Sequence, residues 1–405
     1  MILKSKYAVM TILGILPVFA HATSEKISTN WEKQIDLFFG EYIVGPLAAL
    51  LFWPIPGIEM PLVVAWLLGG ALFFTLRMRF VNVRLFKHAI YLVRGKYDDP
   101  SQIGEVTHFQ ALTTAVSGTV GVGNVVHVAV AISIGGPGAT FWLIVAGFLG
   151  MASKFVECTL GVKYRQTNKD GSVSGGPMFY IDKGFAELKW PRLGKTMAWY
   201  YAVCLILGAL GAGCMFQANQ AYVQFVNVTG GDASFFAERG WVFGLILAVV
   251  TGLVIIGGIK SIARVTSRLV PFMALLYVAA ALFVLGVNFS EIPAAIESIF
   301  VNAFSPDGVT GGVIAVLVLG FRRAAFSNEA GVGSSSIAHA AVRTKEPLTQ
   351  GFVAMLEPFI DTVVICTITA LVITVTVYDP AMLNDGAISG VELTSSAFAS
   401  VVPWF

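Results

Sequence analysis

The sequence predicts an all-α polytopic membrane protein in which two of the spanning helices are interrupted. Hydrophobic residues make up 56% of the 405 residues, charged residues only 12%, and the mean hydropathy is +0.77. A soluble domain carries about twice that share of charged residues. Several apolar stretches reach the ~20 residues that cross a bilayer. Two of them, 111–134 and 311–341, contain glycines and polar residues near their middle.

The first 22 residues have the pattern of a secretory signal peptide. Lys4 and Lys6 precede an apolar run, and Ala20-His21-Ala22 follows as an A-x-A cleavage motif. The run is shorter than a membrane span needs. The pattern therefore favours a signal-peptide-like segment over 1–22 that is cleaved, with an uncleaved anchor as the alternative.

Residues 23–59 are expected to form an external, interfacial segment. An amphipathic stretch and a short apolar run in it predict a helix that ends before two prolines. The first convincing span is 60–76, and the six Lys and Arg residues of 77–105 mark the side that follows it as cytoplasmic. An extra transmembrane helix and a cytoplasmic loop thus fill 60–110.

Seven further spans follow, and the charges of their loops support an alternating topology. These spans are expected at 111–134, 139–162, 197–222, 240–257, 268–287, 312–340 and 351–377. The loops that this topology places in the cytoplasm are 77–105, 163–196, 258–268 and 341–349. They hold 18 of the 26 Lys and Arg residues, whereas the opposite loops between spans hold only Arg239.

Two motifs recur in the same order, which predicts an internal repeat. The run Gly-Val-Gly-Asn at 121–124 returns as Gly-Val-Gly-Ser at 331–334. A pattern of Met, Phe, a β-branched residue and an acid in 151–157 returns in 355–361. One unit holds five spans, and because five is odd the second copy must be inverted in the membrane.

The repeat divides the rest of the chain into a first five-helix repeat over 111–290 and the start of a second, inverted repeat over 291–405. A full second copy would be longer than 291–405. We therefore expect the second repeat to be incomplete here, so that the sequence is truncated at its C-terminal end.

The first interruption offers the chemistry of a cation and substrate site. Three glycines in the run Ser117-Gly-Thr-Val-Gly-Val-Gly-Asn124 each weaken the helix by roughly 1 kcal/mol. Unwound backbone survives in a membrane only where it faces protein or a wet cavity. Free N–H groups at the start of a half-helix suit a carboxylate, and unwound carbonyls suit Na⁺, with Thr119 and Asn124 side chains as further ligands. The alternative is that these glycines only permit close helix packing.

The second interruption carries a comparable polar run. Ser327 and Asn328 are candidate ligands, and Phe326 is placed to close over a small side chain. Gln217 lies in a span made mostly of small and apolar residues, where it either contacts substrate or braces a neighbouring helix. Lys154 and Glu157, three residues apart on one helix, are expected to pair with each other.

Other classes of function find little support. The five histidines lack metal-ligand spacing, and no phosphate-binding loop or hydrolase constellation is visible, so no catalytic residue is predicted and the protein is not expected to be an enzyme. No basic run interleaved with aromatic residues indicates nucleic acid. A channel or proton relay on the same helices would need continuous polar or Asp/Glu/His stripes, and few are present.

Four long motifs resemble the alanine or glycine:cation symporter family, the sodium:alanine symporters. They are Gly135-Gly-Pro-Gly-Ala139, Met151–Glu157, Gly175-Gly-Pro-Met-Phe-Tyr-Ile181 and Phe326-Ser-Asn-Glu-Ala-Gly331, and the resemblance covers about 60–400. It implies a LeuT-type fold of ten core helices in two inverted repeats. It also implies Na⁺-driven uptake of alanine or glycine across the inner membrane of a bacterial cell.

The resemblance also implies roles for individual residues. The carbonyls of Ser117 and Val120 would hold one sodium ion, and the Thr119 carbonyl with Asn124 a second. The substrate site would comprise Gly118, Thr119, Gly123, Phe216, Gln217, Phe326 and Asn328.

The chain departs from the family pattern in two places. His127 stands where a small residue is usual, and Ala324 where glycine is expected after a basic pair. The helix that normally supplies hydroxyl ligands to one sodium site would lie beyond Phe405. The expected function is sodium-coupled symport by alternating access, and the alternatives are an H⁺-coupled amino-acid carrier and a truncated remnant that does not transport.

Overall fold

The computed structural model describes all residues except 1–33, 35–36, 57–59, 305–311, 379–389 and 403–405. Met1–Trp66 and Leu67–Phe405 form separate compact units. In the first unit, η1 (Gly40–Val44) and α4 (Gly45–Leu51) continue an apolar helix that starts at Leu37, within the segment expected to hold a helix. The predicted signal peptide over 1–22 lies outside the described residues.

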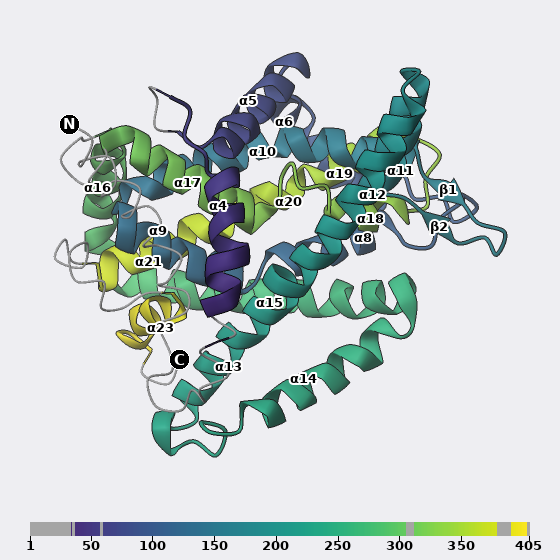
Figure 1. The fold of residues 1–405 in the computed structure, drawn as a ribbon. Coiled ribbons are helices and arrows are strands. Elements are labelled where there is room, and N and C mark those ends of the chain that lie inside the picture. Colours follow the sequence, from purple (N-terminus) through teal and green to yellow (C-terminus); the bar gives the residue numbers. More distant parts are fainter. Residues whose placement is uncertain (1–33, 35–36, 57–59, 305–311, 379–389, 403–405) are drawn as a thin grey trace. The chain divides into compact units, whose positions relative to one another are not determined.

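The second unit is almost entirely helical, as predicted, and Figure 1 shows its long helices. Four continuous helices among the described residues are long and apolar enough to cross a membrane. Two of these are α10 (Gly138–Lys163) and α15 (Gly258–Val287). The third, Pro191–Val228, is formed by α12 (Pro191–Gly208), η3 (Ala209–Met215) and α13 (Phe216–Val228). The fourth, Pro347–Thr376, is formed by α19 (Pro347–Ala354), α20 (Leu356–Pro358), η6 (Phe359–Cys366) and α21 (Thr367–Thr376).

The predicted first span, 60–76, is α5 (Leu62–Arg77), which begins in the first unit. At 16 residues it is shorter than the ~20 that a perpendicular span needs. The predicted span 240–257 is likewise a 16-residue helix, α14 (Gly240–Ile255). The sequence thus places both helices correctly, but neither is by itself long enough for a full crossing at right angles.

The interrupted spans are divided as predicted. The first consists of α8 (His108–Thr119), η2 (Gly123–His127) and α9 (Val128–Gly135), and its two halves are bent by 48°. The second consists of α17 (Gly312–Asn328) and α18 (Ser335–Ala340). Both helices are therefore interrupted in this structure.

Several predicted loops are in fact folded. The stretch 258–268, predicted as the loop between the spans 240–257 and 268–287, forms the first turns of α15. The remaining elements of the second unit lie mostly in predicted loops: α6 (Val81–Arg84), α7 (Phe86–Val93), β1 (Gln166–Thr167), β2 (Val173–Ser174), α11 (Pro177–Glu187), η4 (Gly231–Ala233), η5 (Phe289–Glu291), α16 (Ile292–Phe304) and α23 (Val391–Ala399). β1 and β2 pair as a short antiparallel hairpin.

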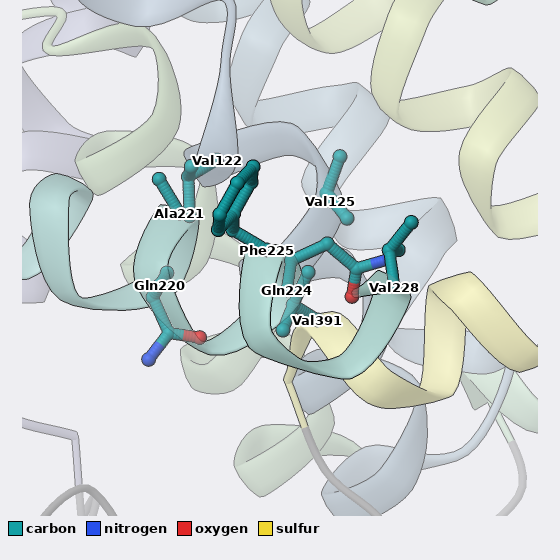
Figure 2. Close-up of a pocket in the computed structure, with 8 residues that line it drawn as sticks. All are labelled: Val122, Val125, Gln220, Ala221, Gln224, Phe225, Val228 and Val391. Carbon is teal, nitrogen blue, oxygen red and sulfur yellow. The ribbon is translucent and has the colours of Figure 1, made fainter. Parts of the chain in front are cut away.

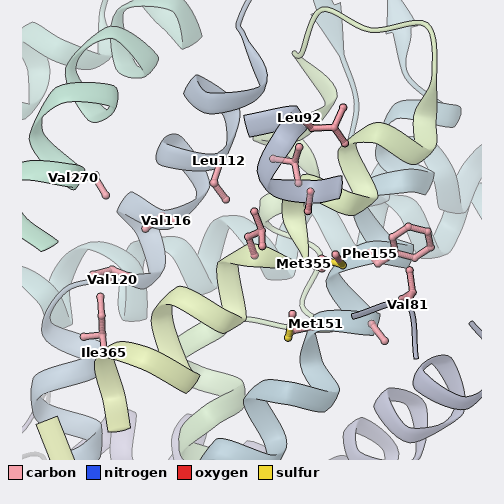
Figure 3. Close-up of a cluster of buried hydrophobic side chains, with 14 residues drawn as sticks. Val81, Leu92, Leu112, Val116, Val120, Met151, Phe155, Val270, Met355 and Ile365 are labelled. Carbon is pink, nitrogen blue, oxygen red and sulfur yellow. The ribbon is translucent and has the colours of Figure 1, made fainter. Parts of the chain in front are cut away.

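The core lies around α10, against which α16, α17, α18 and α19 all pack. Figure 3 shows one buried cluster in which Met151 and Phe155 of α10 meet Met355 and residues of α8. Met151 and Met355 are equivalent positions of the predicted repeat, and both are fully buried in this cluster. Val120, the first residue of the bend in the first interrupted helix, belongs to the same cluster and so anchors the bend to the core.

The loops that the charge pattern places on one side of the membrane do meet in the structure. The guanidinium of Arg165 donates to the carbonyl oxygens of Ile103, Ala340, Val342 and Thr344 at 2.6–3.0 Å. These carbonyls flank the start of α8 and the end of α18. The ends of both interrupted helices are thus fastened together at the side assigned to the cytoplasm.

Close packing of α10 predicts a large effect at its first residue. A Cβ atom on Gly138 would lie 2.3 Å from the backbone carbon of Asn302 in α16, so Gly138→Ala forces the two helices apart. We expect a loss of stability of about 1–3 kcal/mol, measured as a lower unfolding temperature in detergent. The matched control is Gly244→Ala in α14, where an added Cβ would meet nothing within 4 Å. Equal unfolding temperatures for the two variants would contradict this packing.

Candidate substrate and cation site

The first bend is a three-residue turn held by one amide side chain. α8 starts at a capping box between Thr107 and Gln110 and ends at Thr119, after which Val120 is extended (φ −81°, ψ 107°). The Gly121 N–H donates to Asn124 Oδ1 at 2.8 Å, and the Asn124 N–H donates to the Gly121 carbonyl at 3.2 Å. The bend therefore depends on asparagine at 124, which replaces helical hydrogen bonds with its own.

The second bend needs glycine for conformational reasons. Glu329, Gly331 and Gly333 have φ values of 52°, 90° and 92°, in the left-handed region that favours glycine. A Cβ atom on Gly333 would also lie 2.5 Å from Pro177 Cγ. The Asn328 side chain supports the turn by accepting the Ala330 N–H at 2.9 Å. Glycine thus supplies a backbone path that other residues adopt only with strain.

One cavity of about 610 Å³ lies between the two bends and the long α12–α13 helix. The first interrupted helix contributes Ser117, Gly118, Thr119, Gly121 and Gly123. The α12–α13 helix contributes Tyr201, Cys204, Leu205, Gly208, Ala209, Ala212, Gly213 and Gln217. The second interrupted helix and its turn contribute Ala325, Phe326, Ser327, Glu329, Val332 and Ser334. Small residues and backbone therefore dominate the walls, as a small polar ligand requires.

Five of the seven predicted substrate residues line this cavity: Gly118, Thr119, Gly123, Gln217 and Phe326. Phe216 and Asn328 are not among its described lining. Asn328 is buried, and its amide donates to Thr362 Oγ1 at 2.9 Å. The structure thus brings most of the predicted residues together around one space, although their contact with a substrate stays a prediction.

The aromatic rings of His127, Phe216 and Phe326 contact one another beside the cavity. The centroid of His127 lies 4.1 Å from that of Phe326, edge to face, and 5.6 Å from that of Phe216, nearly parallel. His127, which stands where the family pattern has a small residue, thus adds a ring that contacts both phenylalanines. Both predicted phenylalanines therefore belong to one aromatic group, although only Phe326 reaches the cavity.

A buried carboxylate, which the sequence analysis did not include in the site, lies at the centre of a polar cluster next to Ser327. Asp361 of η6 is fully buried and accepts hydrogen bonds from Asn124 Nδ2 at 2.7 Å, Ser327 Oγ at 2.9 Å and Thr362 Oγ1 at 2.6 Å. Among the described residues, no lysine, arginine or histidine forms an ion pair with it. A buried carboxylate with only neutral partners is costly, because its charge is not compensated.

This cluster fits a monovalent cation better than a transition metal. The described part of the chain holds no group of three or more His, Cys, Asp or Glu side chains arranged for a metal ion. The side chains around Asp361 offer carboxylate and hydroxyl oxygens instead, which are suited to Na⁺ at a broken helix. A sodium ion would supply the positive charge that Asp361 lacks.

The predicted sodium ligands lie in two neighbouring places. Ser117 and Thr119 line the cavity, whereas Asn124 belongs to the Asp361 cluster. The Val120 side chain is buried in the apolar core, so only its backbone is available for a cation. The signal for Asp361 in the sequence is the repeat, in which this residue aligns with Glu157 and is an acid within a predicted span.

A second pocket, of about 380 Å³, lies between the first bend, α13 and the start of α23 (Figure 2). Its lining is apolar except for Gln220 and Gln224, and the Gln224 amide donates to Ser395 Oγ at 2.8 Å. The pocket holds no charged side chain among its described lining, and we assign no ligand to it.

Comparison with known proteins shows similarity to the sodium:alanine symporters and to related transporters. The model of the sodium:alanine symporter family matches residues 53–405. The sodium/alanine symporter AgcS of Methanococcus maripaludis is 39% identical over 346 residues, which are 85% of this chain and 74% of that protein. An "Uncharacterized transporter" of Haemophilus influenzae is 38% identical over 82% of this chain and 70% of its own length. The "Probable sodium/glutamine symporter GlnT" of Bacillus subtilis is 35% identical over 89% and 70%.

The family match covers the whole of the second unit, including both bends, the cavity and the Asp361 cluster. The apolar helices and the match agree that this is an integral membrane protein. The chain therefore belongs to the sodium:alanine symporter family.

Proposed function

We propose that this protein is a sodium-coupled symporter of alanine or glycine that works by alternating access in the inner membrane of a bacterial cell. The proposal rests on one observation above all. Two interrupted helices turn their unwound backbone toward the same small cavity, and a buried carboxylate without a cationic partner lies beside it. We further propose that the helices form LeuT-type inverted repeats, in line with the equivalent positions of Met151 and Met355 in the core.

Sodium would be held beside the cavity by oxygen atoms of both interrupted helices. We propose Asp361 and Ser327 as side-chain ligands, together with the backbone carbonyls of Ser117, Thr119 and Val120. Asn124, which the sequence predicts as a ligand, donates its amide to Asp361 and would hold that carboxylate in place. Sodium bound there supplies a positive charge close to the place where a substrate carboxylate would lie. An amino acid is therefore bound more tightly when sodium is present, and this mutual dependence is the basis of coupled transport.

The cavity walls account for a small zwitterionic substrate. The helix that starts at Gly123 directs free N–H groups and its positive dipole end toward the bend, which suits the substrate carboxylate. Gly118, Gly208 and Gly213 have no side chain to occupy the cavity, and Phe326 borders the space where the side chain of the substrate would lie. A methyl group or a hydrogen atom is the side chain that such a space favours.

Uptake into proteoliposomes tests the proposal. With an inward Na⁺ gradient, radiolabelled alanine should accumulate above its external concentration, since sodium entry drives it inward. An equal K⁺ gradient is the control and should give only equilibration. Accumulation driven by a proton gradient without sodium would favour an H⁺-coupled carrier. Absence of uptake together with absence of alanine binding would favour a protein that does not transport.

A further inference from the structure

Three charged side chains meet in the core outside the proposed sodium and substrate sites. Lys154 and Glu157 of α10 and Glu357 of α20 are 0%, 6% and 0% exposed. Lys154 Nζ lies 3.1 Å from Glu357 Oε1 and 3.5 Å from Glu157 Oε1, so the predicted pair of Lys154 and Glu157 is confirmed and extended by a third member. We call these three residues the buried triad.

The triad carries one more negative charge than positive if both carboxyls are ionised. Glu157 Oε1 and Glu357 Oε2 are buried atoms without a hydrogen-bond partner among the described residues. The titratable groups nearest the triad are Cys158, Tyr180, Tyr201, Glu329 and His339, and among the described residues Lys154 is the only cation that forms an ion pair with either carboxylate. A buried, unbalanced charge of this kind is strongly disfavoured unless something neutralises it.

A proton fits this place better than a metal ion. A sodium ion needs several oxygen ligands, and the ammonium group of Lys154 already lies between the two carboxylates, where it would repel a second cation. A proton needs only one oxygen lone pair. We propose that the buried triad is a proton-binding site, in which one proton adds to a carboxylate oxygen of Glu157 or Glu357 to form an O–H bond.

The triad also contacts the bend of the second interrupted helix. Glu157 Oε2 accepts the Gly331 N–H at 3.1 Å, and Ser335 Oγ, at the start of α18, donates to Glu357 Oε1 at 2.9 Å. Lys154 is also hydrogen-bonded to Ser335. A change in the charge of the triad would therefore alter the hydrogen bonds that hold the turn, and this turn places Glu329 and Ser334 at the cavity wall. Binding of substrate in the cavity and the position of the proton are coupled through this turn.

Infrared spectroscopy of the full chain in lipid nanodiscs tests the site without any substrate. A protonated carboxyl has a C=O stretch distinct from that of a carboxylate. We expect this band in the wild-type protein at about pH 6, where an exposed glutamate with a pKa near 4.3 would be ionised. The band should be lost in Glu157→Gln or in Glu357→Gln and kept in Glu346→Gln, an exposed control.

Selective ¹³C labelling of glutamate side chains in the wild-type protein makes the test independent of variants that fail to fold, because the label shifts a glutamic acid band but not an aspartic acid band. No labelled protonated band, or a band that both glutamine variants keep, would overturn the proposal. Loss of the band when Na⁺ is added would also overturn it, since it would indicate a metal ion in the triad.

The coupling between substrate binding and the proton of the triad rests on the proposed function. It is measured separately, by adding alanine with Na⁺ to the same sample. We expect the protonated band to change in size or position. If alanine binds and the band does not change, the coupling is wrong, whereas failure of alanine to bind counts against the proposed function alone. The band in the absence of substrate decides the proton site in either case.

Discussion

Replacing Asp361 with asparagine is expected to abolish sodium-dependent uptake of alanine. The variant keeps the size of the side chain and part of its hydrogen bonding to Ser327 and Thr362, but it removes the only negative charge of the cluster. Loss of one partner of a buried charge pair costs about 2–5 kcal/mol, so sodium affinity should fall on the order of 100-fold. Calorimetric titration with NaCl, followed by uptake in proteoliposomes, measures the effect.

Two comparisons make the Asp361 experiment specific. Asp232→Asn changes an exposed aspartate of η4 and should leave both sodium binding and uptake unchanged. Asn124→Ala removes a donor to Asp361 and the side chain that closes the first bend, so it should also weaken sodium-dependent binding. Wild-type sodium affinity in Asp361→Asn would show that the cluster does not hold the coupling ion.

Filling the cavity at Gly118 should block transport while the fold remains intact. An added Cβ atom on Gly118 would meet nothing within 4 Å, so valine there extends into the cavity rather than into a neighbouring helix. Forcing a substrate against such a side chain costs about 1–3 kcal/mol, which corresponds to about a 5- to 150-fold loss of alanine affinity. Binding calorimetry and the unfolding temperature, measured on the same sample, separate the two effects.

The matched control for Gly118 is Gly244→Val in α14. An added Cβ atom there also meets open space, but Gly244 is not among the lining of the cavity. We expect this variant to bind and transport alanine like the wild type. If Gly118→Val also transports normally, the cavity between the two bends is not the substrate path. If it unfolds at a much lower temperature, Gly118 serves packing, the alternative role of the glycines.

The interrupted helices could be predicted because their cause is local. Glycines and an asparagine within eight residues weaken a helix wherever they occur, and the second bend repeats the pattern. The extent of α15 could not be predicted from the same kind of argument. The apolar pattern predicts a span only from 268, because Lys260 and Arg264 interrupt it, but charged residues do not prevent a helix and α15 begins at Gly258.

The Asp361 cluster shows why the site could be predicted only in part. The backbone chemistry of the first bend is visible within a single stretch. The contact between Asn124 and Asp361 joins residues 237 positions apart, and nothing in either stretch identifies the other. The excess charge of the buried triad has the same origin, since Glu357 meets Lys154 only through the packing of α20 against α10. Such contacts follow from tertiary packing rather than from spacing.

The hydrogen bonds of Arg165 hold the chain before α8 and the end of α18 together. The planar guanidinium of Arg165 donates to four carbonyl oxygens, one before the start of α8 and three at or after the end of α18. The main chains of Val106 and Val342, next to them, also form a β-bridge. If the proposed transport opens the protein on this side, several hydrogen bonds must break together, and one side chain cannot simply swing aside. In that proposed cycle, the rate of opening would set an upper limit on turnover, whatever the affinity of the binding site.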